Sequence, residues 1–458
     1  MTLKTSIHLT AAVAMLVLAT AGCDRDTGGL EPTPPNTNPI VFLDDFSSGL
    51  DYQAFLGSKL DAVSIDFNDR FAGTASLRVA IPDGEWSGGA FTTGTVRDLS
   101  GYDALTFMAK SSIPSTLDVA GLGNDNTGTS KFTAEWKSIP LTTSWQKFVI
   151  PIPLPEKLSS EQGLFFFAEA PEGGGHEVWF DEVKFETVGN ISNPRPAIAT
   201  ETVNTFVGAI LNVQGTRVIF NVGGSDQTID HLPGYLTFAS SNDTVAAVID
   251  GAVRLVGKGS ATITAKLGEV DATGVVTVIS KVAPTTAAPN PTHPAGDVIS
   301  LFSNTYTDVP VDRWLTDWSQ EAEVVDFRVA GNDVKAYTIT DVGFAGIEWA
   351  PDSARTIDAT AMTHFHVDLW VGEGTYFGVK LVDFGADGVF GGDQDNQDSE
   401  HEIFVLETTT PALVAGEWIS LDIPLTDFTS LLSTEHLAQI VIRHDVSTAF
   451  IDNVFFHK

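Results

Sequence analysis

The sequence predicts an all-β protein made of three tandem β-sandwiches after an N-terminal signal peptide. Apolar residues alternate with polar ones at period two in many short segments, and Gly, Asn and Asp clusters separate these segments. At 458 residues the chain is also too long for one hydrophobic core. Typical alternating segments are 218–222, 261–266, 275–279, 365–370 and 402–406. Only one short helix is predicted, at about Ser433–Ala438.

The N-terminus has the features of a secretory signal. An apolar run, Leu9–Leu18, follows Lys4 and is too short to span a bilayer. Small residues precede Cys23, the only cysteine of the chain, and this arrangement resembles a bacterial lipobox, with Thr20 where leucine is usual. The resemblance implies removal of residues 1–22, lipidation of Cys23 and an outer-membrane anchor at the cell surface. An ordinary signal peptide with an incidental cysteine, and a periplasmic orientation, stay open as alternatives.

The charge balance restricts the partners. The chain has 59 acidic and 25 basic residues, a formal net charge of −34. Nucleic acid is excluded as a partner because its phosphates need a basic surface. An anionic glycan is disfavoured for the same reason, whereas a neutral ligand or a bound cation fits this charge.

Three proline-rich stretches divide the chain, at residues 24–39, 189–198 and 282–296. Such stretches favour extended spacers over packed cores. The boundaries that follow are a signal peptide at 1–22, a linker at 23–39, a sandwich at 40–188, a middle domain at 197–281, a linker at 282–296 and a sandwich at 297–458.

The first and third blocks share landmarks in the same order. Both open with an apolar strand beside acidic residues and both have Trp a few residues before an Ile-Pro strand. Both close on a strand with Asp near its middle. The paired segments are 41–46 with 297–302, 145–151 with 418–424, and 178–185 with 450–456. The two blocks are therefore predicted to be divergent copies of one plan.

Two family resemblances follow. Blocks one and three resemble carbohydrate-binding modules of the jelly-roll, galactose-binding-like type. The third is similar to the C-terminal module attached to family 16 β-glucanases of marine Bacteroidota, through 297–306, Trp314–Trp318, Gly346–Trp349 and 451–454. The middle block resembles a group 2 bacterial Ig-like domain through 240–248, 250–251, 258–259 and 261–265. These resemblances imply glycan binding, with a laminarin-like β-1,3-glucan as the expected ligand.

No catalytic arrangement is found in the sequence. A family 16 hydrolase needs two glutamates and an aspartate along one strand. Glu269-Val-Asp271 lacks the second glutamate, and Ser399-Glu-His-Glu402 lacks the aspartate, so both are interpreted as surface carboxylates. There is no Gly-x-Ser-x-Gly and no His-Glu-x-x-His motif. The chain is therefore predicted not to be an enzyme.

Aromatic residues in polar surroundings are the candidates for glycan contact. Sugar rings present flat C–H faces on which Trp and Tyr stack, while amides and carboxylates bind the hydroxyl groups. Partly buried packing is the alternative for each candidate. Trp145, Trp179 and Trp418 lie in the shared strands and are expected in cores. The predicted glycan-binding residues are Trp314, Trp318, Trp349, Glu348, Tyr376, Trp86 and Trp136.

The acidic residues suggest structural calcium, a hard cation that prefers oxygen ligands. In modules of the resembling type an ion often joins the first and last strands, which implies Asp45 with Asp181 and Asp297 with Asp452. Solvated acids at strand ends are the alternative. The loop from Asp383 to Glu400 is either another calcium site or a long hairpin loop over the glycan site.

The sequence thus predicts a non-catalytic lipoprotein that captures a neutral polysaccharide for a glycan uptake or degradation system, with an outer-membrane importer as an expected partner. Two sandwiches on one anchor would raise avidity for a long chain. An adhesin that binds protein partners, and a cryptic hydrolase, are the rival hypotheses.

Overall fold

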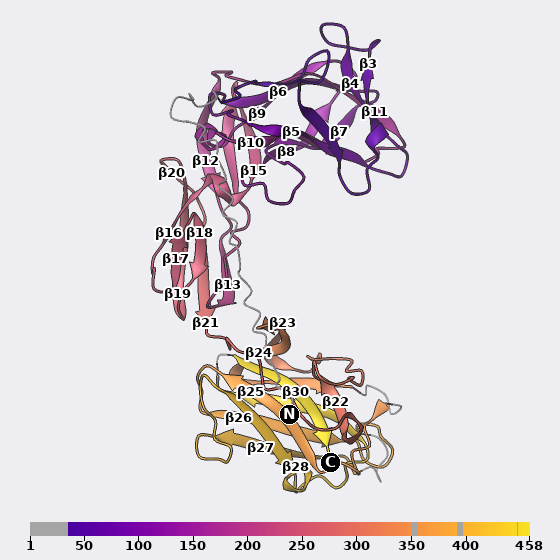
Figure 1. Cartoon of the computed structure of the whole chain (residues 1–458), viewed down its shortest axis with the longest axis vertical. Coiled ribbons are helices and arrows are strands. Elements are labelled where there is room, and N and C mark those ends of the chain that lie inside the picture. The colour runs from indigo at the N-terminus through magenta and orange to yellow at the C-terminus, as the bar shows by residue number, and fades with distance from the viewer. Residues whose placement is uncertain (1–34, 350–354, 392–396, 447) are drawn as a thin grey trace, which may run out of the picture.

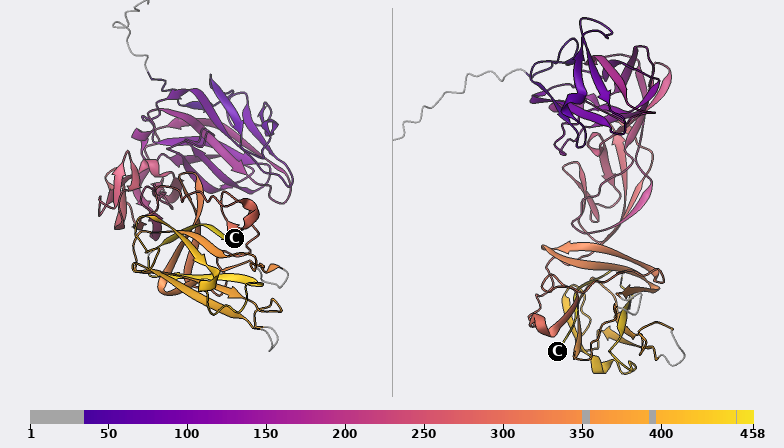
Figure 2. Two further views of the ribbon diagram at one scale, coloured as in Figure 1. Left: turned by 60° about the horizontal axis from the view of Figure 1, so that its bottom comes forward. Right: turned by 90° about the vertical axis from the view of Figure 1, so that its right-hand side faces the viewer.

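The computed structural model describes residues 35–349, 355–391, 397–446 and 448–458. These residues form thirty strands and short 3-10 turns, so the prediction of an all-β chain of tandem sandwiches is confirmed. Figures 1 and 2 show a narrow middle block between two larger sandwiches. No helix among the described residues is long and apolar enough to cross a membrane.

The predicted helix at Ser433–Ala438 is wrong. These residues form a turn that leads into β29 (Leu437–His444). Side chains take the backbone N–H groups that a helix would use: Ser433 Oγ accepts from Glu435 at 2.9 Å, and Asp383 Oδ2 accepts from His436 at 2.8 Å. Local side-chain acceptors compete with helix formation in this way.

The first sandwich packs a sheet ordered β3-β4-β11-β6-β9, with β1 beside β11, against β8-β7-β10-β5-β2. Its core contains Phe107, Phe165 and Phe180, whose ring centroids lie 5.3–5.6 Å apart. The strands are β1 (Ile40–Phe42), β2 (Leu50–Ala54), β3 (Val63–Asp66), β4 (Ser76–Ile81), β5 (Ser87–Arg97), β6 (Ala104–Ser111), β7 (Ser115–Leu122), β8 (Ala134–Leu141), β9 (Gln146–Pro151), β10 (Glu161–Glu169) and β11 (His176–Glu186).

The middle block contributes strands to the first sandwich. The hairpin β14 (Arg217–Val222)–β15 (Ser225–His231) pairs with β8, with Asp230 opposite Glu135, and β12 (Ile191–Ala197) adds to its outer edge. The segment expected as a proline-rich spacer thus holds a strand, because an edge strand tolerates proline. One buried apolar cluster runs through both blocks.

The rest of the middle block forms its own small sheets. The larger is ordered β13-β21-β19-β16 with β20 on β19, and the smaller is β17-β18. These strands are β13 (Glu201–Phe206), β16 (Thr237–Ser240), β17 (Ala246–Ile249), β18 (Ala252–Leu255), β19 (Gly259–Leu267), β20 (Val270–Asp271) and β21 (Val276–Lys281).

The third sandwich is held together by one long strand, β24, which takes part in both layers. Its first half pairs with β30 and its last residues pair with β29. The order is β27-β26-β29-β24-β30-β25-β28, with β22 on β30 and β23 on β24. The strands are β22 (Val298–Phe302), β23 (Gln320–Val329), β24 (Asn332–Glu348), β25 (His364–Val371), β26 (Tyr376–Asp383), β27 (Ser399–Leu406), β28 (Trp418–Pro424) and β30 (Ala449–His457).

The closing strands of the first and third sandwiches match in two respects. β1 pairs with β11, and β22 pairs with β30, both antiparallel and both with an irregular register. In each closing strand the residue that follows the aspartate, Asp181 or Asp452, has a positive φ: +50° at Glu182 and +48° at Asn453. A left-handed residue at the same place in both closing strands is typical of a β-bulge retained from a common plan.

Two contacts join the third sandwich to the chain before it. Phe206 of the middle block lies 4.9 Å from Phe327 and 5.3 Å from Phe450, ring centre to ring centre. The 282–296 linker lies along the sandwich, where Trp418 Nε1 donates to the carbonyl of Thr286 at 2.7 Å. This linker is therefore docked where the sequence predicted a free spacer.

Candidate functional site

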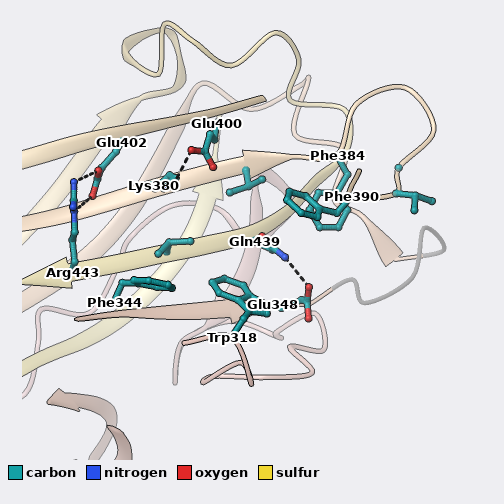
Figure 3. A pocket seen from close by; sticks show the side chains of 14 residues that line it. Trp318, Phe344, Glu348, Lys380, Phe384, Phe390, Glu400, Glu402, Gln439 and Arg443 are labelled. Carbon is teal, nitrogen blue, oxygen red and sulfur yellow. Dashed lines mark hydrogen bonds and ion pairs between the residues drawn. The ribbon is translucent and has the colours of Figure 1, made fainter. Parts of the chain in front are cut away.

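A groove of about 910 Å³ lies on the outer face of the β24-β29-β26-β27 layer (Figure 3). Strand alternation builds it: on β26, Val379 and Leu381 enter the core, so Lys380 and Val382 face outward. The lining residues are Trp318, Phe344, Glu348, Lys380, Val382, Phe384, Gly388, Val389, Phe390, Glu400, Glu402, Gln439, Val441 and Arg443.

The floor of the groove is a regular grid set by strand register. One row runs across four strands as Glu348, Gln439, Val382 and Glu400. The next row runs as Gly346, Val441, Lys380 and Glu402. Polar groups from strands distant in sequence therefore lie side by side along the floor.

Each carboxylate of the floor has a side-chain donor. Arg443 donates to both oxygens of Glu402, at 2.6 and 2.5 Å, and this bond raises the pKa of Arg443. Lys380 Nζ lies 3.0 Å from Glu400. These contacts are drawn as dashed lines in Figure 3.

Gln439 Nε2 donates to Glu348 Oε1 at 2.8 Å, which completes the set of three paired carboxylates. Charge-assisted and bidentate contacts hold planar groups in fixed orientations. Three carboxylates and two cations leave the floor with one net negative charge. The floor thus offers oriented acceptors and donors of the kind that bind hydroxyl groups.

The indole of Trp318 lies against the sheet at Gly346. A Cβ added to Gly346 would lie 2.1 Å from Cη2 and 2.4 Å from Cζ3 of the indole. Only glycine lets the ring come this close, and the ring stays 40% exposed to solvent. Phe344 lies beside it, with ring centroids 6.0 Å apart (Figure 3). The two rings form an aromatic wall along the groove.

A second aromatic pair comes from the loop between β26 and β27. Phe384 is buried and packs against Phe390, with the two ring centroids 5.5 Å apart. Phe390 itself is 66% exposed. Gly388 and Val389 of the same loop also line the groove. The described part of this loop therefore forms one wall of the groove. Asp393 and Asp395 lie outside the described residues.

The structure brings together two of the predicted glycan-binding residues, Trp318 and Glu348. Trp349 follows Glu348 on the chain and points to the opposite side. It is 1% exposed, and its Nε1 donates to the carbonyl of Leu437 at 2.9 Å. The alternative of packing therefore holds for Trp349. Trp314 is half-buried under Lys335, whose Nζ lies 4.9 Å from its ring centre.

The other predicted residues lie apart from the groove. Tyr376 is on β26 but packs edge-on against Phe404 at 5.8 Å, beyond the lining. Trp86 lines a separate hollow of about 230 Å³ on the first sandwich, next to the Lys59–Glu85 ion pair. Trp136 of the first sandwich is half-buried; its ring lies 6.1 Å from that of Phe148.

The three tryptophans that were expected in cores differ in burial. Trp179 is buried as predicted. Trp145 and Trp418 are half-buried. Trp145 lies just before its strand, and Trp418 is the first residue of its strand, so both lie at a strand end. Trp418 also donates a hydrogen bond to the linker.

Several groove residues were missed by the sequence analysis. Glu400 and Glu402 were interpreted as ordinary surface carboxylates, and Lys380, Gln439 and Arg443 were not singled out. Lys380 and Gln439 each lie between two buried apolar residues of their strands, so the sequence does indicate a polar face on β26 and β29. Which strands lie side by side is a long-range property that this local pattern does not contain.

The acidic residues predicted to hold calcium in the first sandwich do not share contacts. Asp181 is buried, and its Oδ2 accepts backbone N–H bonds from Phe71 and Ala72 at 2.8 and 3.1 Å. Asp45 is exposed and accepts from the N–H of Phe46 at 2.8 Å. Each oxygen named here already has a protein donor.

The same holds for the third sandwich. Asp297 lies 3.0 Å from Lys458 Nζ. Asp452 accepts from the N–H of Asn453 at 2.7 Å, and burial raises its pKa to about 6. Among the described residues no group of three or more His, Cys, Asp or Glu could hold a metal ion. Cys23, the predicted lipidation site, lies outside the described residues.

Comparisons with known proteins return solved structures only. No protein-family model matches the chain, and no curated protein is significantly similar to it. The family 30 carbohydrate-binding module of a cellulosomal cellulase of Clostridium thermocellum is 20% identical, covers 34% of this chain and 96% of its own, and has a TM-score of 0.24.

Two further solved structures have similarly low scores. A family 11 carbohydrate-binding module from Clostridium thermocellum, in complex with a β-1,3-1,4-mixed-linked tetrasaccharide, is 16% identical over 35% of this chain and 95% of its own, with a TM-score of 0.24. The tandem CBM22-1–CBM22-2 domain of Paenibacillus barcinonensis Xyn10C is 11% identical over 93% of this chain and 99% of its own, with a TM-score of 0.21.

Proposed function

We propose that this chain is a non-catalytic polysaccharide-binding protein and that the groove of its third sandwich is the binding site. The observation that carries the proposal is Trp318, which lies against Gly346 and is 40% exposed beside a floor of oriented polar groups. A pyranose ring needs this pair of features, because its C–H faces are apolar and its edge carries hydroxyl groups.

The charge of the groove supports a neutral ligand. Glu400 and Glu402 are each paired with a cation, and Glu348 is bonded to the neutral Gln439. A uronic acid would place its carboxylate against a floor that is already net negative, in a protein with a net charge of −34. A neutral glucan has no such repulsion, and we take a laminarin-like β-1,3-glucan as the first ligand to test.

We further propose that the protein is anchored through Cys23 at the outer membrane, facing the cell surface. There it captures the glycan for an uptake or degradation system and hands it to an outer-membrane importer. The lipobox-like residues before Cys23 support the anchor. A structural calcium ion at Asp45 with Asp181, or Asp297 with Asp452, remains part of the proposal and is tested by the same titrations with and without a chelator.

The test is affinity electrophoresis and calorimetry on residues 24–458, which include every described residue, with laminarin, mixed-linkage β-glucan, starch, xylan and alginate. We expect selective binding of one neutral glucan, and its loss in Trp318→Ala. Trp145→Ala, which removes a half-buried tryptophan of the first sandwich, is the matched control and should bind normally.

Each outcome decides between hypotheses. Equal binding by wild type and Trp318→Ala would show that the binding site lies outside the groove. Selective binding of alginate would refute the neutral-ligand argument. No retardation by any of the five glycans would overturn the proposed function and favour an adhesin.

A further inference from the structure

Four histidines gather on the outer face of the other layer of the third sandwich, the one that contains β25, β28 and β30. The ring of His293, from the 282–296 linker, stacks on His457 with centroids 3.9 Å apart. His364 stacks on His457 from β25 at 5.0 Å, with an interplanar angle of 5°. His366 stacks on Phe455 at 4.4 Å.

One carboxylate, that of Asp422, contacts two of these rings. Asp422 Oδ1 lies 2.7 Å from Nε2 of His457 and 3.3 Å from Nδ1 of His366. The second acid at the cluster, Asp368, lies 3.5 Å from Nε2 of His366 but also accepts from Asn453 Nδ2 at 2.7 Å.

The remaining charges nearby are Asp297 and Lys458, which bond each other at 3.0 Å. No other acid of the described residues is recorded in contact with the four rings. Asp422 can therefore balance one charged imidazole fully, and Asp368 helps only at His366. A charge on both His293 and His457 has no second acid to offset it.

His293 belongs to a segment that is tied down at few points. Asn453 Nδ2 donates to the carbonyl of Pro289 at 3.0 Å, and Tyr306 Oη donates to the carbonyl of His293 at 2.9 Å. Together with the bond from Trp418 to Thr286, these contacts hold the linker along the sandwich. The ring of His293 stacks on His457 at 3.9 Å and lies edge-on to the ring of Phe455 at 5.9 Å.

We propose that residues 284–294 form a strap that is docked on the third sandwich near neutral pH and released in mild acid, when both His293 and His457 become protonated. Two imidazolium rings stacked at 3.9 Å repel each other, and the ring on the linker is the one that can leave. Release frees the linker but leaves the groove, on the opposite layer, unchanged.

The direction of the pH effect follows from the pKa of His293. Burial, and then the charge of His457, lower the pKa of His293 from its usual value of about 6.5. Docking thus favours the neutral ring, so its contribution is present above the unfolded pKa and is lost as the pH falls through the docked value.

Hydrogen–deuterium exchange of residues 24–458 at pH 7 and pH 5, corrected for the intrinsic rate, tests the proposal. We expect the indole N–H of Trp418, which donates to the carbonyl of Thr286 in the strap, to exchange at least about 10-fold faster at pH 5, a loss of about 1.4 kcal/mol in docking free energy. The amides of β25 and β30 should keep their protection.

Two variants separate the stack from general acid effects. His293→Phe keeps a flat ring that cannot be charged, and its Trp418 indole N–H should stay protected at both pH values. His436→Gln, a turn histidine on the opposite layer, should respond to acid as the wild type does. Equal corrected exchange at both pH values, or acid release in His293→Phe, would overturn the proposal. Glycan affinity is not part of this test, so its outcome is independent of the proposed function.

Discussion

Gly346 gives the sharpest test of how the groove works. In Gly346→Ala the new Cβ would lie 2.1 Å from Cη2 of Trp318, whereas ordinary carbon contacts are 3.4–4.0 Å. The indole must therefore move outward by about 1.5 Å. Gly346 has no positive φ, so alanine suits the strand backbone, and Trp318, being 40% exposed, has room to move. The hydroxyl of Thr316, which would lie 2.5 Å from the new Cβ, must turn away as well. The folded protein should survive while the stacking surface shifts.

The expected magnitude follows from the stacking energy. An aromatic contact contributes about 0.5–1.5 kcal/mol beyond its buried area. Loss of its alignment should weaken glycan binding about 10-fold, since 1.4 kcal/mol is a factor of ten in Kd. Calorimetric titration with the preferred glucan measures the change, and a urea unfolding curve checks stability. Undiminished affinity in a natively stable Gly346→Ala would refute the view that binding needs the close contact of the indole with the sheet at Gly346.

Three other predictions concern stability and electrostatics. Trp349→Ala should lower the free energy of unfolding by about 3–5 kcal/mol, because it empties a fully buried site; a urea curve like that of Trp318→Ala would contradict this. A double-mutant cycle of Arg443→Met with Glu402→Gln should give a coupling of about 0.5–1 kcal/mol in unfolding free energy, and additive effects would show that the 2.6 Å bond contributes nothing. Burial lowers the pKa of His444 to about 4 from 6.5, so the folded state favours the neutral ring. Stability should therefore fall by about 3 kcal/mol as the pH drops from 6.5 to 4, and His444→Phe should flatten that slope, as measured by urea unfolding across this range.

The fold class could be predicted because its signal is local. Period-two alternation marks each strand, and the two closing strands share Asp181 and Asp452 at the same place in the pattern. The short helix was wrongly predicted because Asp383, fifty-three residues away, takes the N–H of His436. No window of neighbouring residues contains that contact.

The candidate site could be predicted only in part. Trp318 and Glu348 were predicted from the polar context of Trp318 and from the resemblance of their segments to carbohydrate-binding modules. Trp349 was placed beside them in sequence, but strand alternation sends it to the core. Arg443 and Glu402 pair across β29, β26 and β27, and this register is fixed by long-range pairing. The pattern within each strand indicates a polar face without saying which faces combine.

The hairpin β14–β15 has a consequence for how such a chain can evolve. Tandem modules are exchanged between genes most easily when each closes its own sheet. Here the middle block contributes a hairpin to the sheet of its predecessor through Asp230 and Glu135, and a single apolar cluster spans both. A recombination point placed at residue 189 would leave one sheet without its outer strands and the other block without part of its core. Residues 35–281 therefore form one unit through strand pairing, whereas no described strand of the third sandwich pairs with that unit.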